Sequence, residues 1–247
     1  MNPHIYFMLR YIQPSKKLEA YYKTNLPLHY ASFKSNGDEQ LHKLLNKKAN
    51  LNERDKEFNT ALHVACDRKN KNQVACLLSH SADINAVNVM NETPLMLATK
   101  KNHLDIVELL LQHQAKLNYK NKDSDTALHI ACRNHDEELV QLLLDYGANP
   151  NIAGSLSYYP LHSACLTTSW RLVSFLIRRN AFVNVTTFLG ESPLHLICNI
   201  TLKESLAIKR QHLDVLHQQR VHEERLLLAE KNSSTNQKPR KFFSIRS

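Results

Sequence analysis

The chain has 247 residues, and its 32 Lys and Arg outnumber its 23 Asp and Glu, for a net charge of +9. A basic balance is compatible with an acidic partner, a nucleic acid or an anionic surface. However, acids are mixed with bases, as in residues 52–57, which favours a solvated surface over a track for phosphates, so nucleic-acid binding is not expected. The chain has only 4 Gly, which argues against a phosphate-cradling loop.

Residues 1–24 form an N-terminal extension ahead of the repetitive part of the chain. Residues 5–12 are apolar, but this run is too short to span a bilayer, is interrupted by Arg10 and lacks a basic start. It is therefore neither a signal peptide nor a membrane helix, and we expect a soluble, cytoplasmic protein. The extension is predicted to be a degenerate half-repeat cap with a short helix over residues 16–22, or alternatively a binding peptide.

A short pattern recurs along the chain. Residues 60–66 and 126–132 both read Thr-Ala-Leu-His-x-Ala-Cys, and further copies begin at Thr93, Tyr159 and Ser192 with Pro in second place. With an earlier copy at residues 26–31, the central leucines are spaced once by 34 residues and then always by 33: Leu28, Leu62, Leu95, Leu128, Leu161 and Leu194. A fixed period of this size indicates a repeat architecture.

Each copy has the chemistry of a helix start. Thr or Ser stands at the N-cap, where its hydroxyl accepts from a free backbone N–H, and Pro follows where its missing N–H costs nothing. Further on, residues 106–111 and 139–144 have the apolar spacing of a second amphipathic helix. Gly or Asn then suits the turn that follows. One such pair cannot bury its apolar face alone, so the units are expected to stack and share a core.

The Thr-Pro-Leu-His-x-Ala core at this period resembles the ankyrin repeat. The resemblance implies an all-α fold, a solenoid of stacked helix-turn-helix units with short hairpin loops. Repeat one carries an extra residue within residues 34–38, and because glycines are few, Lys, Asn, Ser or Phe must take positive φ at several turns. The repeat domain is predicted over residues 25–200, with repeats at 25–58, 59–91, 92–124, 125–157, 158–190 and from 191 onward.

The sixth repeat departs from the pattern after Cys198. The His-Leu-Asp-Ile segment that opens the second helix of repeat three at His103 returns as His-Leu-Asp-Val at residues 212–215, after an insertion of about ten residues. Residues 201–231 are predicted to form a divergent helical cap, with a coiled coil as the alternative. Residues 232–247 are predicted to be a disordered basic tail, and residues 238–241 resemble a nuclear-import signal, so a nuclear location is the alternative to the cytoplasm.

The cysteines and the motif histidines are predicted to be structural, so no cofactor and no metal are expected. Cys66, Cys132, Cys165 and Cys198 occupy one place in their repeats, facing the core, which favours small buried hydrophobes over a metal site or disulfides. The motif histidines recur one repeat apart, with no nucleophile or acid recurring beside them. In the ankyrin family this His forms hydrogen bonds between neighbouring repeats.

Two further residue types have structural predictions. Trp170 stands in a slot usually held by Leu and is predicted to fill the core. The Asn at each repeat end is predicted to stabilise the turn through its side chain, with enzymatic hydroxylation as the alternative: Asn85, Asn118, Asn151 and Asn184.

The resemblance implies that partners bind the concave side, which is built from hairpin tips and the exposed face of each first helix. The tip positions precede each motif and are Lys56, Glu57, Asn59, Val89, Met90, Glu92, Lys122, Asp123, Asp125, Leu156, Tyr158, Phe188 and Leu189. The first-helix positions follow the motif Ala by two and three residues and are Phe33, Lys34, Asp67, Arg68, Lys100, Lys101, Arg133, Asn134, Leu166 and Thr167.

From these positions we select the candidate partner-binding residues. Repeats two to four present mostly charge, and repeats five and six mostly apolar side chains. The apolar residues are predicted to form the hot spot; the alternative is that they pack under the divergent C-terminal helices. The candidates are Leu156, Tyr158, Leu166, Phe188, Leu189, Val89, Met90, Lys100, Lys101, Lys122, Arg133, Lys56 and Arg68.

The resemblance implies non-catalytic recognition of a partner protein by an adaptor or scaffold, not an enzyme. Two related functions are kept as alternatives: a substrate adaptor that recruits a ubiquitin ligase, for which no clear suppressor-of-cytokine-signalling box is present, and an effector of an intracellular bacterium or virus acting on host proteins. The identity of the partner does not follow from the fold.

Overall fold

The computed structural model describes residues 16–167 and 169–199. The chain divides into two compact units, residues 1–197 and 198–247, and the repeat stack belongs to the first. The predicted helical cap at residues 201–231, its coiled-coil alternative and the predicted tail at residues 232–247 lie outside the described residues. The predicted domain boundaries stay predictions.

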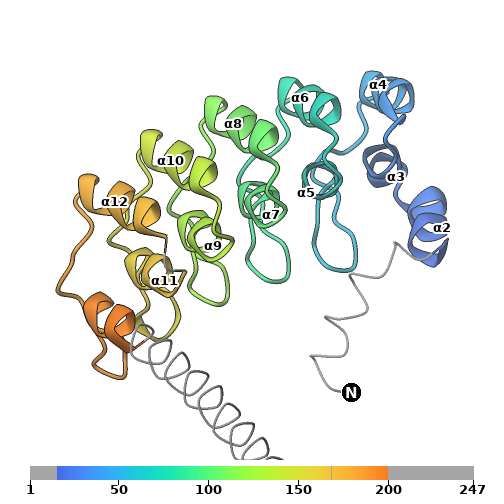
Figure 1. Ribbon diagram of the computed structural model, residues 1–247. Coiled ribbons are helices and arrows are strands. Elements are labelled where there is room, and N and C mark those ends of the chain that lie inside the picture. The colour runs from blue at the N-terminus through green and yellow to red at the C-terminus, as the bar shows by residue number, and fades with distance from the viewer. Residues whose placement is uncertain (1–15, 168, 200–247) are drawn as a thin grey trace, which may run out of the picture. The chain divides into compact units, whose positions relative to one another are not determined.

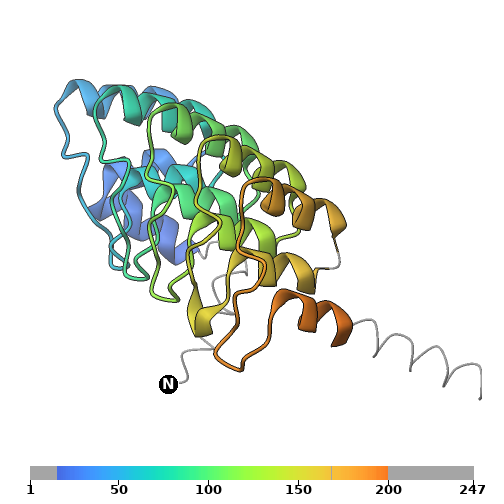
Figure 2. The same cartoon turned by 90° about the vertical axis from the view of Figure 1, so that its left-hand side faces the viewer.

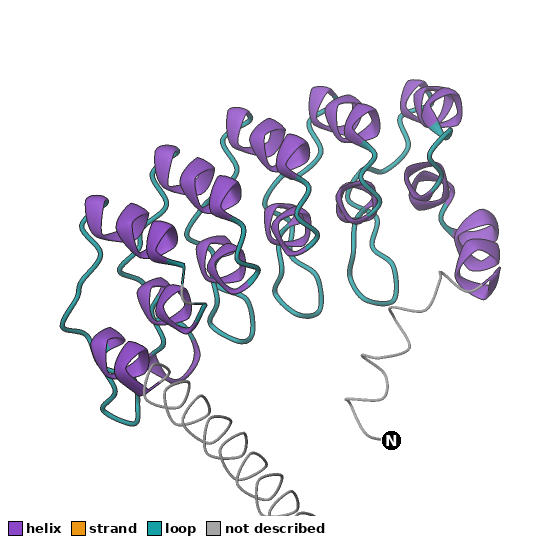
Figure 3. Ribbon diagram, in the orientation of Figure 1, coloured by secondary structure: helices purple, strands orange, loops and turns teal. Residues whose placement is uncertain are grey.

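The described helices form two layers (Figures 1 and 3). The inner layer consists of α3 (Pro27–Phe33), α5 (Ala61–Asp67), α7 (Pro94–Lys100), α9 (Ala127–Arg133) and α11 (Pro160–Leu166). The outer layer consists of α4 (Asp38–Asn46), α6 (Lys71–Ser79), α8 (Leu104–Gln112), α10 (Glu137–Asp145) and α12 (Trp170–Arg178). The helix α2 (Lys16–Asn25) precedes the first pair, the 3-10 turn η1 (Ser155–Ser157) lies before α11, and residues 193–199 are helical.

Neighbouring pairs share one core. Each inner helix packs on the next inner helix, each outer helix on the next outer helix, and the two helices of a pair on each other. The motif leucines of repeats one to five are all buried in a single cluster that runs through the stack: Leu28, Leu62, Leu95, Leu128 and Leu161. Burying a Leu side chain contributes roughly 1.5–3 kcal/mol. The predicted all-α solenoid is confirmed.

The predicted capping chemistry is seen at Thr93, whose hydroxyl accepts from the backbone N–H of Met96 at 3.3 Å. The predicted bond of the motif histidine to the next repeat is confirmed at His29, His63, His129 and His162. In repeat two the Thr60 N–H donates to His63 Nδ1 at 3.1 Å, so Nδ1 is an acceptor and Nε2 carries the proton that it donates to the Glu92 carbonyl at 3.1 Å. His129 repeats this with the Tyr158 carbonyl at 3.2 Å. Burial lowers the pKa of His63 to about 4, so the ring is neutral at pH 7 and ties one repeat to the next.

The turns use residues other than glycine in the left-handed region, as predicted. Among them are Lys48, Phe58, Ser81 and Asn180, with φ of 56°, 61°, 66° and 60°. A different constraint holds at Gly37, in the longer connection of repeat one. A Cβ atom there would lie 2.0 Å from the Ala31 carbonyl oxygen, so the chain can cross close to α3 only without a side chain.

Three of the four asparagines at the repeat ends, Asn85, Asn118 and Asn151, are structural, but the hydrogen bonds of their side chains run to the next repeat and not to their own turn as predicted. Asn85 Oδ1 accepts from the backbone N–H of Lys116 at 2.9 Å, and Asn118 Oδ1 accepts from that of Asn149 at 3.0 Å. Asn151 Oδ1 accepts from Phe182 at 2.7 Å. These amides therefore join neighbouring loops.

Two predictions about burial are wrong. Trp170 is 73% exposed. It begins α12, and at the corresponding place in α10 Glu137 contacts Ser169 and Arg171 of the following repeat, so this position faces the next repeat. Cys198 is also exposed. Within residues 169–199 no outer helix follows α12, so the cover that buries the corresponding residues of earlier repeats is missing from the described part.

The other three cysteines of that register agree with the prediction. Cys66, Cys132 and Cys165 are buried. Burial raises the pKa of Cys132 to about 12 and that of Cys165 to about 11, so both thiols stay protonated at neutral pH. A protonated, covered thiol is neither a nucleophile nor a metal ligand, and packs as a small hydrophobe.

Candidate partner-binding surface

The hairpin tips lie side by side along one edge of the inner layer (Figure 2). They are residues 55–59, 88–92, 121–125, 154–158 and 187–191, and together with the last turns of the inner helices they are called the tip face below. Backbone hydrogen bonds join successive tips at three junctions, from Val89 to Glu57 (2.8 Å), from Lys122 to Met90 (3.0 Å) and from Phe188 to Leu156 (2.9 Å). Among the described residues no such bond joins the third tip to the fourth.

The first residue of each early tip closes the loop with its side chain. Asn88 Oδ1 accepts from the backbone N–H of Met90 and of Glu92, both at 2.9 Å, and Asp55 does the same in the tip before it. Gly154 holds this place in the fourth tip, where a Cβ atom would lie 2.9 Å from Asp125 Oδ1. The tip without that side chain turns as η1 and places Leu156 at φ 51°.

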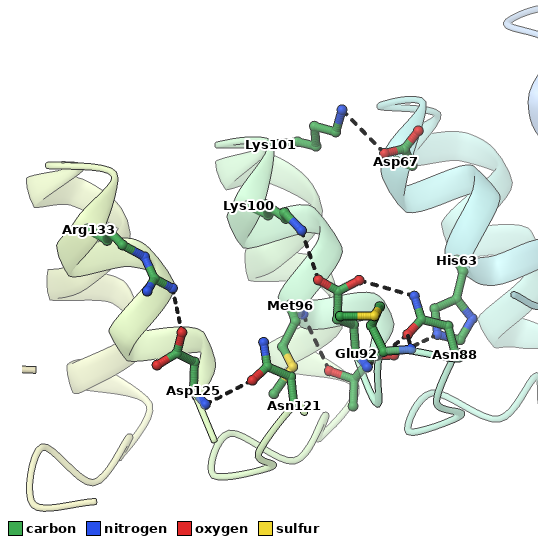
Figure 4. A network of polar contacts seen from close by, with 12 residues as sticks. His63, Asp67, Asn88, Glu92, Met96, Lys100, Lys101, Asn121, Asp125 and Arg133 are labelled. Carbon is green, nitrogen blue, oxygen red and sulfur yellow. Dashed lines mark hydrogen bonds and ion pairs between the residues drawn. The ribbon is translucent and has the colours of Figure 1, made fainter. Parts of the chain in front are cut away.

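Buried carboxylates hold cations on the tip face of repeats three and four (Figure 4). Lys100 Nζ lies 2.9 Å from Glu92 Oε1, and Arg133 Nη2 lies 2.6 Å from Asp125 Oδ2. Both carboxylates are buried, whereas Arg133 is exposed. A cation held in this way is positioned before any partner arrives.

Cations stack on aromatic rings at the N-terminal end of the tip face. The guanidinium of Arg68 lies 3.9 Å from the centroid of the Phe33 ring, and Lys56 Nζ lies 4.5 Å from that of Tyr21. Burial lowers the pKa of the Arg68 guanidinium, which remains charged at pH 7. Each contact restrains a long cationic side chain that would otherwise be mobile.

Apolar side chains dominate the other end. Leu156, Phe188 and Leu189 are 67%, 77% and 76% exposed and are called the apolar tip cluster. The backbone bond from Phe188 to Leu156 brings two adjacent tips together beneath them. Leu166, at the end of α11, is exposed as well. Large apolar groups gain nothing from such exposure in a free monomer.

Several predicted tip residues are not available to a partner. Asn59, Glu92 and Asp125 are buried, because each closes a tip or holds a cation. Tyr158 is half-buried, packs against the core and lies 5.6 Å from the His162 ring, so its exposure was overestimated.

The remaining tip candidates differ in exposure, and one exposed tip residue was not among the candidates. Lys56, Val89 and Lys122 are exposed, while Met90 is partly buried. This residue is Phe58, an exposed aromatic side chain at φ 61°. The sequence gives a sign of it, because Phe58 is a bulky residue at the place in its tip that Gly190 occupies in the last tip.

No metal-ligating cluster is present in the described part of the chain. Across residues 16–167 and 169–199, no three His, Cys, Asp or Glu side chains cluster in a way that could hold a metal ion. Cys76 Sγ lies 3.5 Å from His42 Nδ1 beside a cavity of about 260 Å³, but burial raises the pKa of this thiol, which disfavours the nucleophilic thiolate. None of the described helices combines the length and hydropathy needed to cross a membrane.

Comparison with protein-family models identifies the repeats. A family model described as ankyrin repeats in three copies matches residues 28–121, 82–154 and 115–187, which together run without a gap from residue 28 to residue 187. No curated protein matches the chain.

Proposed function

Because the chain belongs to the ankyrin-repeat family, we propose that it is an adaptor or scaffold that binds a partner protein on its tip face. Repeats of this family generally mediate protein–protein interactions and are typically non-catalytic. The fold supplies the surface, and the side chains on it select the partner. We propose no catalytic activity and no metal for this chain.

The apolar tip cluster carries the proposal. Its three side chains are each exposed by two thirds or more, and they stand on tips that a backbone hydrogen bond joins. An apolar cluster of this kind on a protein surface usually marks an interaction site. Interface energy concentrates in a few such residues at the centre of a contact, while surrounding charges set association rate and register.

The candidate residues divide between these two roles. The apolar tip cluster and Leu166 would supply the affinity, and Tyr158 would support them from its half-buried place. The others would orient the partner: Lys56, Arg68, Val89, Met90, Lys100, Lys101, Lys122 and Arg133. Of these, Lys100 and Arg133 are held by buried carboxylates, which supports a fixed orientation.

The test compares two exposed phenylalanines. Partners are purified from the native cell with the full chain, and their affinity is then measured for Phe188→Ser and for Phe182→Ser. Phe182 is also exposed but lies on the loop just after α12, outside the tip residues 187–191. We expect Phe188→Ser to weaken binding by about 2 kcal/mol or more and Phe182→Ser to have little effect. Equal affinities for the two variants would contradict the proposal.

The finer alternatives, recruitment of a ubiquitin ligase or action as an effector on host proteins, depend on what a second surface binds. Purification of partners with and without residues 200–247 distinguishes them from a simple scaffold. Loss of one partner and retention of another on truncation would support a two-sided adaptor. A cytoplasmic location, with the nucleus as the alternative, stays a prediction.

A further inference from the structure

The guanidinium of Arg133 has N–H donors that no described residue uses. It is the last residue of α9, and its Nη2 bonds Asp125 Oδ2 at 2.6 Å, while its side chain is 60% exposed (Figure 4). Within the described part of the chain Asp125 is its one hydrogen-bond partner. A guanidinium has five N–H donors in a planar fork that fits a carboxylate with two parallel bonds. Most of that fork remains for an acceptor from outside.

Asp125 fixes the place of this guanidinium. Its side chain is only 7% exposed, and its backbone N–H donates to Asn121 Oδ1 at 2.9 Å, so the carboxylate sits on a closed tip. An Arg held in advance loses less rotamer freedom when a ligand binds. Lys100 makes the same kind of pair with Glu92 one repeat earlier, which shows that a lysine also satisfies a buried carboxylate at this position.

The charge around Arg133 favours an acidic group. The ends of the inner helices in repeats one to four carry five cations, Lys34, Arg68, Lys100, Lys101 and Arg133. One half-buried acid, Asp67, lies among them, while Glu92 and Asp125 lie buried beneath. Asp67 lies 3.5 Å from Lys101 and 3.9 Å from Arg68 and so interrupts the cationic row. An interrupted row suits a single carboxylate better than a continuous phosphate backbone.

Apolar side chains begin one repeat beyond Arg133. Leu166 stands at the end of α11, the place that Arg133 occupies in α9, and the two helices pack against each other. Neighbouring helix axes lie about 10 Å apart. An extended chain advances about 3.3 Å per residue, so it passes from Arg133 to Leu166 in about three residues.

We infer that the partner presents an extended segment in which an Asp or Glu lies about three residues from a large apolar residue. The carboxylate binds the free donors of Arg133, and the apolar side chain sits on Leu166 and the apolar tip cluster. This inference rests on the proposed function and gives the chemistry of the segment that the tip face recognises.

The experiment selects peptides from a random 12-residue library displayed on phage, with the full chain as bait. We expect the enriched peptides to share an acidic residue at a constant spacing, close to three, from Leu, Ile, Met, Phe or Trp. The strongest peptide is then synthesised with Glu or Gln at the acidic position, and its affinity is measured by fluorescence anisotropy.

Matched arginines provide the control. Arg171 on the outer helix α12 is as exposed as Arg133 and also pairs with a carboxylate, Glu137. We expect Arg133→Gln to weaken binding of the Glu peptide at least about 10-fold and Arg171→Gln to change it less than about 2-fold. On Arg133→Gln the Glu and Gln peptides should bind alike. Arg133→Lys, which keeps a charge beside Asp125 but lacks the fork, should weaken the Glu peptide about 3-fold or more even if Arg133→Gln folds poorly.

Each remaining outcome counts against the inference. Enriched peptides without an acid at constant spacing, no enrichment at all, or equal losses from Arg133→Gln and Arg171→Gln would overturn it, as would a preference of the chain for single-stranded nucleic acid over every peptide. If binding of the purified partner or of the enriched peptides still weakens on Phe188→Ser, the inference fails and the proposed function stands. If Phe188→Ser has no effect on binding either, both fail.

Discussion

Repeats four and five have the same helices and opposite chemistry on the tip face. In repeat four the buried Asp125 holds Arg133, and at the corresponding places of repeat five stand Tyr158 and Leu166. The inner helices α9 and α11 are nevertheless both seven residues long and begin at the same point of the motif. Residues that face the core determine the helices, so residues on the tip face are free to determine the partner.

The middle of the stack and its last described repeat differ in a second way. Leu128 and Leu194 occupy the same motif position, yet Leu128 is buried in the core cluster and Leu194 is 67% exposed. A repeat buries its apolar face against the next one. The same residue type therefore contributes more to stability where a neighbouring repeat covers it than where it is exposed.

The largest expected effect tests that second contrast. Leu128→Ala leaves a cavity in the core cluster and should lower the free energy of unfolding by about 2–5 kcal/mol. Leu194→Ala removes exposed atoms and should cost less than about 1 kcal/mol. Urea denaturation followed by circular dichroism measures both. A loss from Leu194→Ala as large as that from Leu128→Ala would mean that Leu194 is covered in the full protein.

Protonation should loosen the stack, because the buried histidines join its repeats. Burial lowers the pKa of His63 to about 4 in the folded chain and also lowers that of His129 and of His162. In the unfolded chain these histidines have a pKa of about 6.5, so below that pH the unfolded chain binds protons that the folded chain does not. The free energy of unfolding therefore falls as the pH is lowered from about 6.5 towards 4, by up to about 3 kcal/mol for His63. Urea denaturation from pH 7 to pH 4 measures the loss.

Replacing His63 by Gln should flatten this pH dependence, because the acid-sensitive group is removed. His113→Gln, at an exposed ring of the outer layer, is the control. Equal flattening by both variants would show that burial between repeats is not the cause.

The contrast between repeats four and five predicts unequal costs at equivalent places. Arg133→Ala leaves the buried Asp125 carboxylate without its cation and should lower stability by about 1–3 kcal/mol. Leu166→Ala, at the matching place of α11, should cost under about 1 kcal/mol because that side chain is exposed. Thermal and urea unfolding of the two variants test this. Equal stability of Arg133→Ala and the wild type would show that the ion pair adds no stability.

The smallest effects concern one position with left-handed backbone that the first and last tips share. Phe58 occupies it in the first tip and Gly190 in the last. Gly190 has φ 77°, so Gly190→Ala should lower the free energy of unfolding by about 1 kcal/mol. Phe58→Gly should gain up to about 1 kcal/mol, because it relieves a left-handed conformation that an aromatic residue adopts only at a cost. The melting temperatures of both variants give the signs, and a loss of stability on Phe58→Gly would mean that the ring makes stabilising contacts.

Much of the fold was predictable because its causes are local. The caps at Thr60 and Thr126, the turns at positive φ and the extra residue before α4 all follow from the chemistry of a few adjacent residues. The place of the tip face followed from the same register. The register did not predict which residues of the tip face are accessible. Tyr158, for example, resembles an exposed tip residue in sequence and yet packs against the core.

The resemblance to the ankyrin repeat implied the hydrogen-bonding histidine that joins one unit to the next. The sequence by itself determined the repeat and the two helices in each unit. These depend on spacing, and spacing is written along the chain. Only the tertiary structure decided which side chains are exposed to solvent. Trp170 is exposed, Asp125 is buried beneath an exposed Arg133, and Gly154 has no room for a side chain. The physical reason is that burial at a given residue is set by the repeat stacked on it, about 33 residues away.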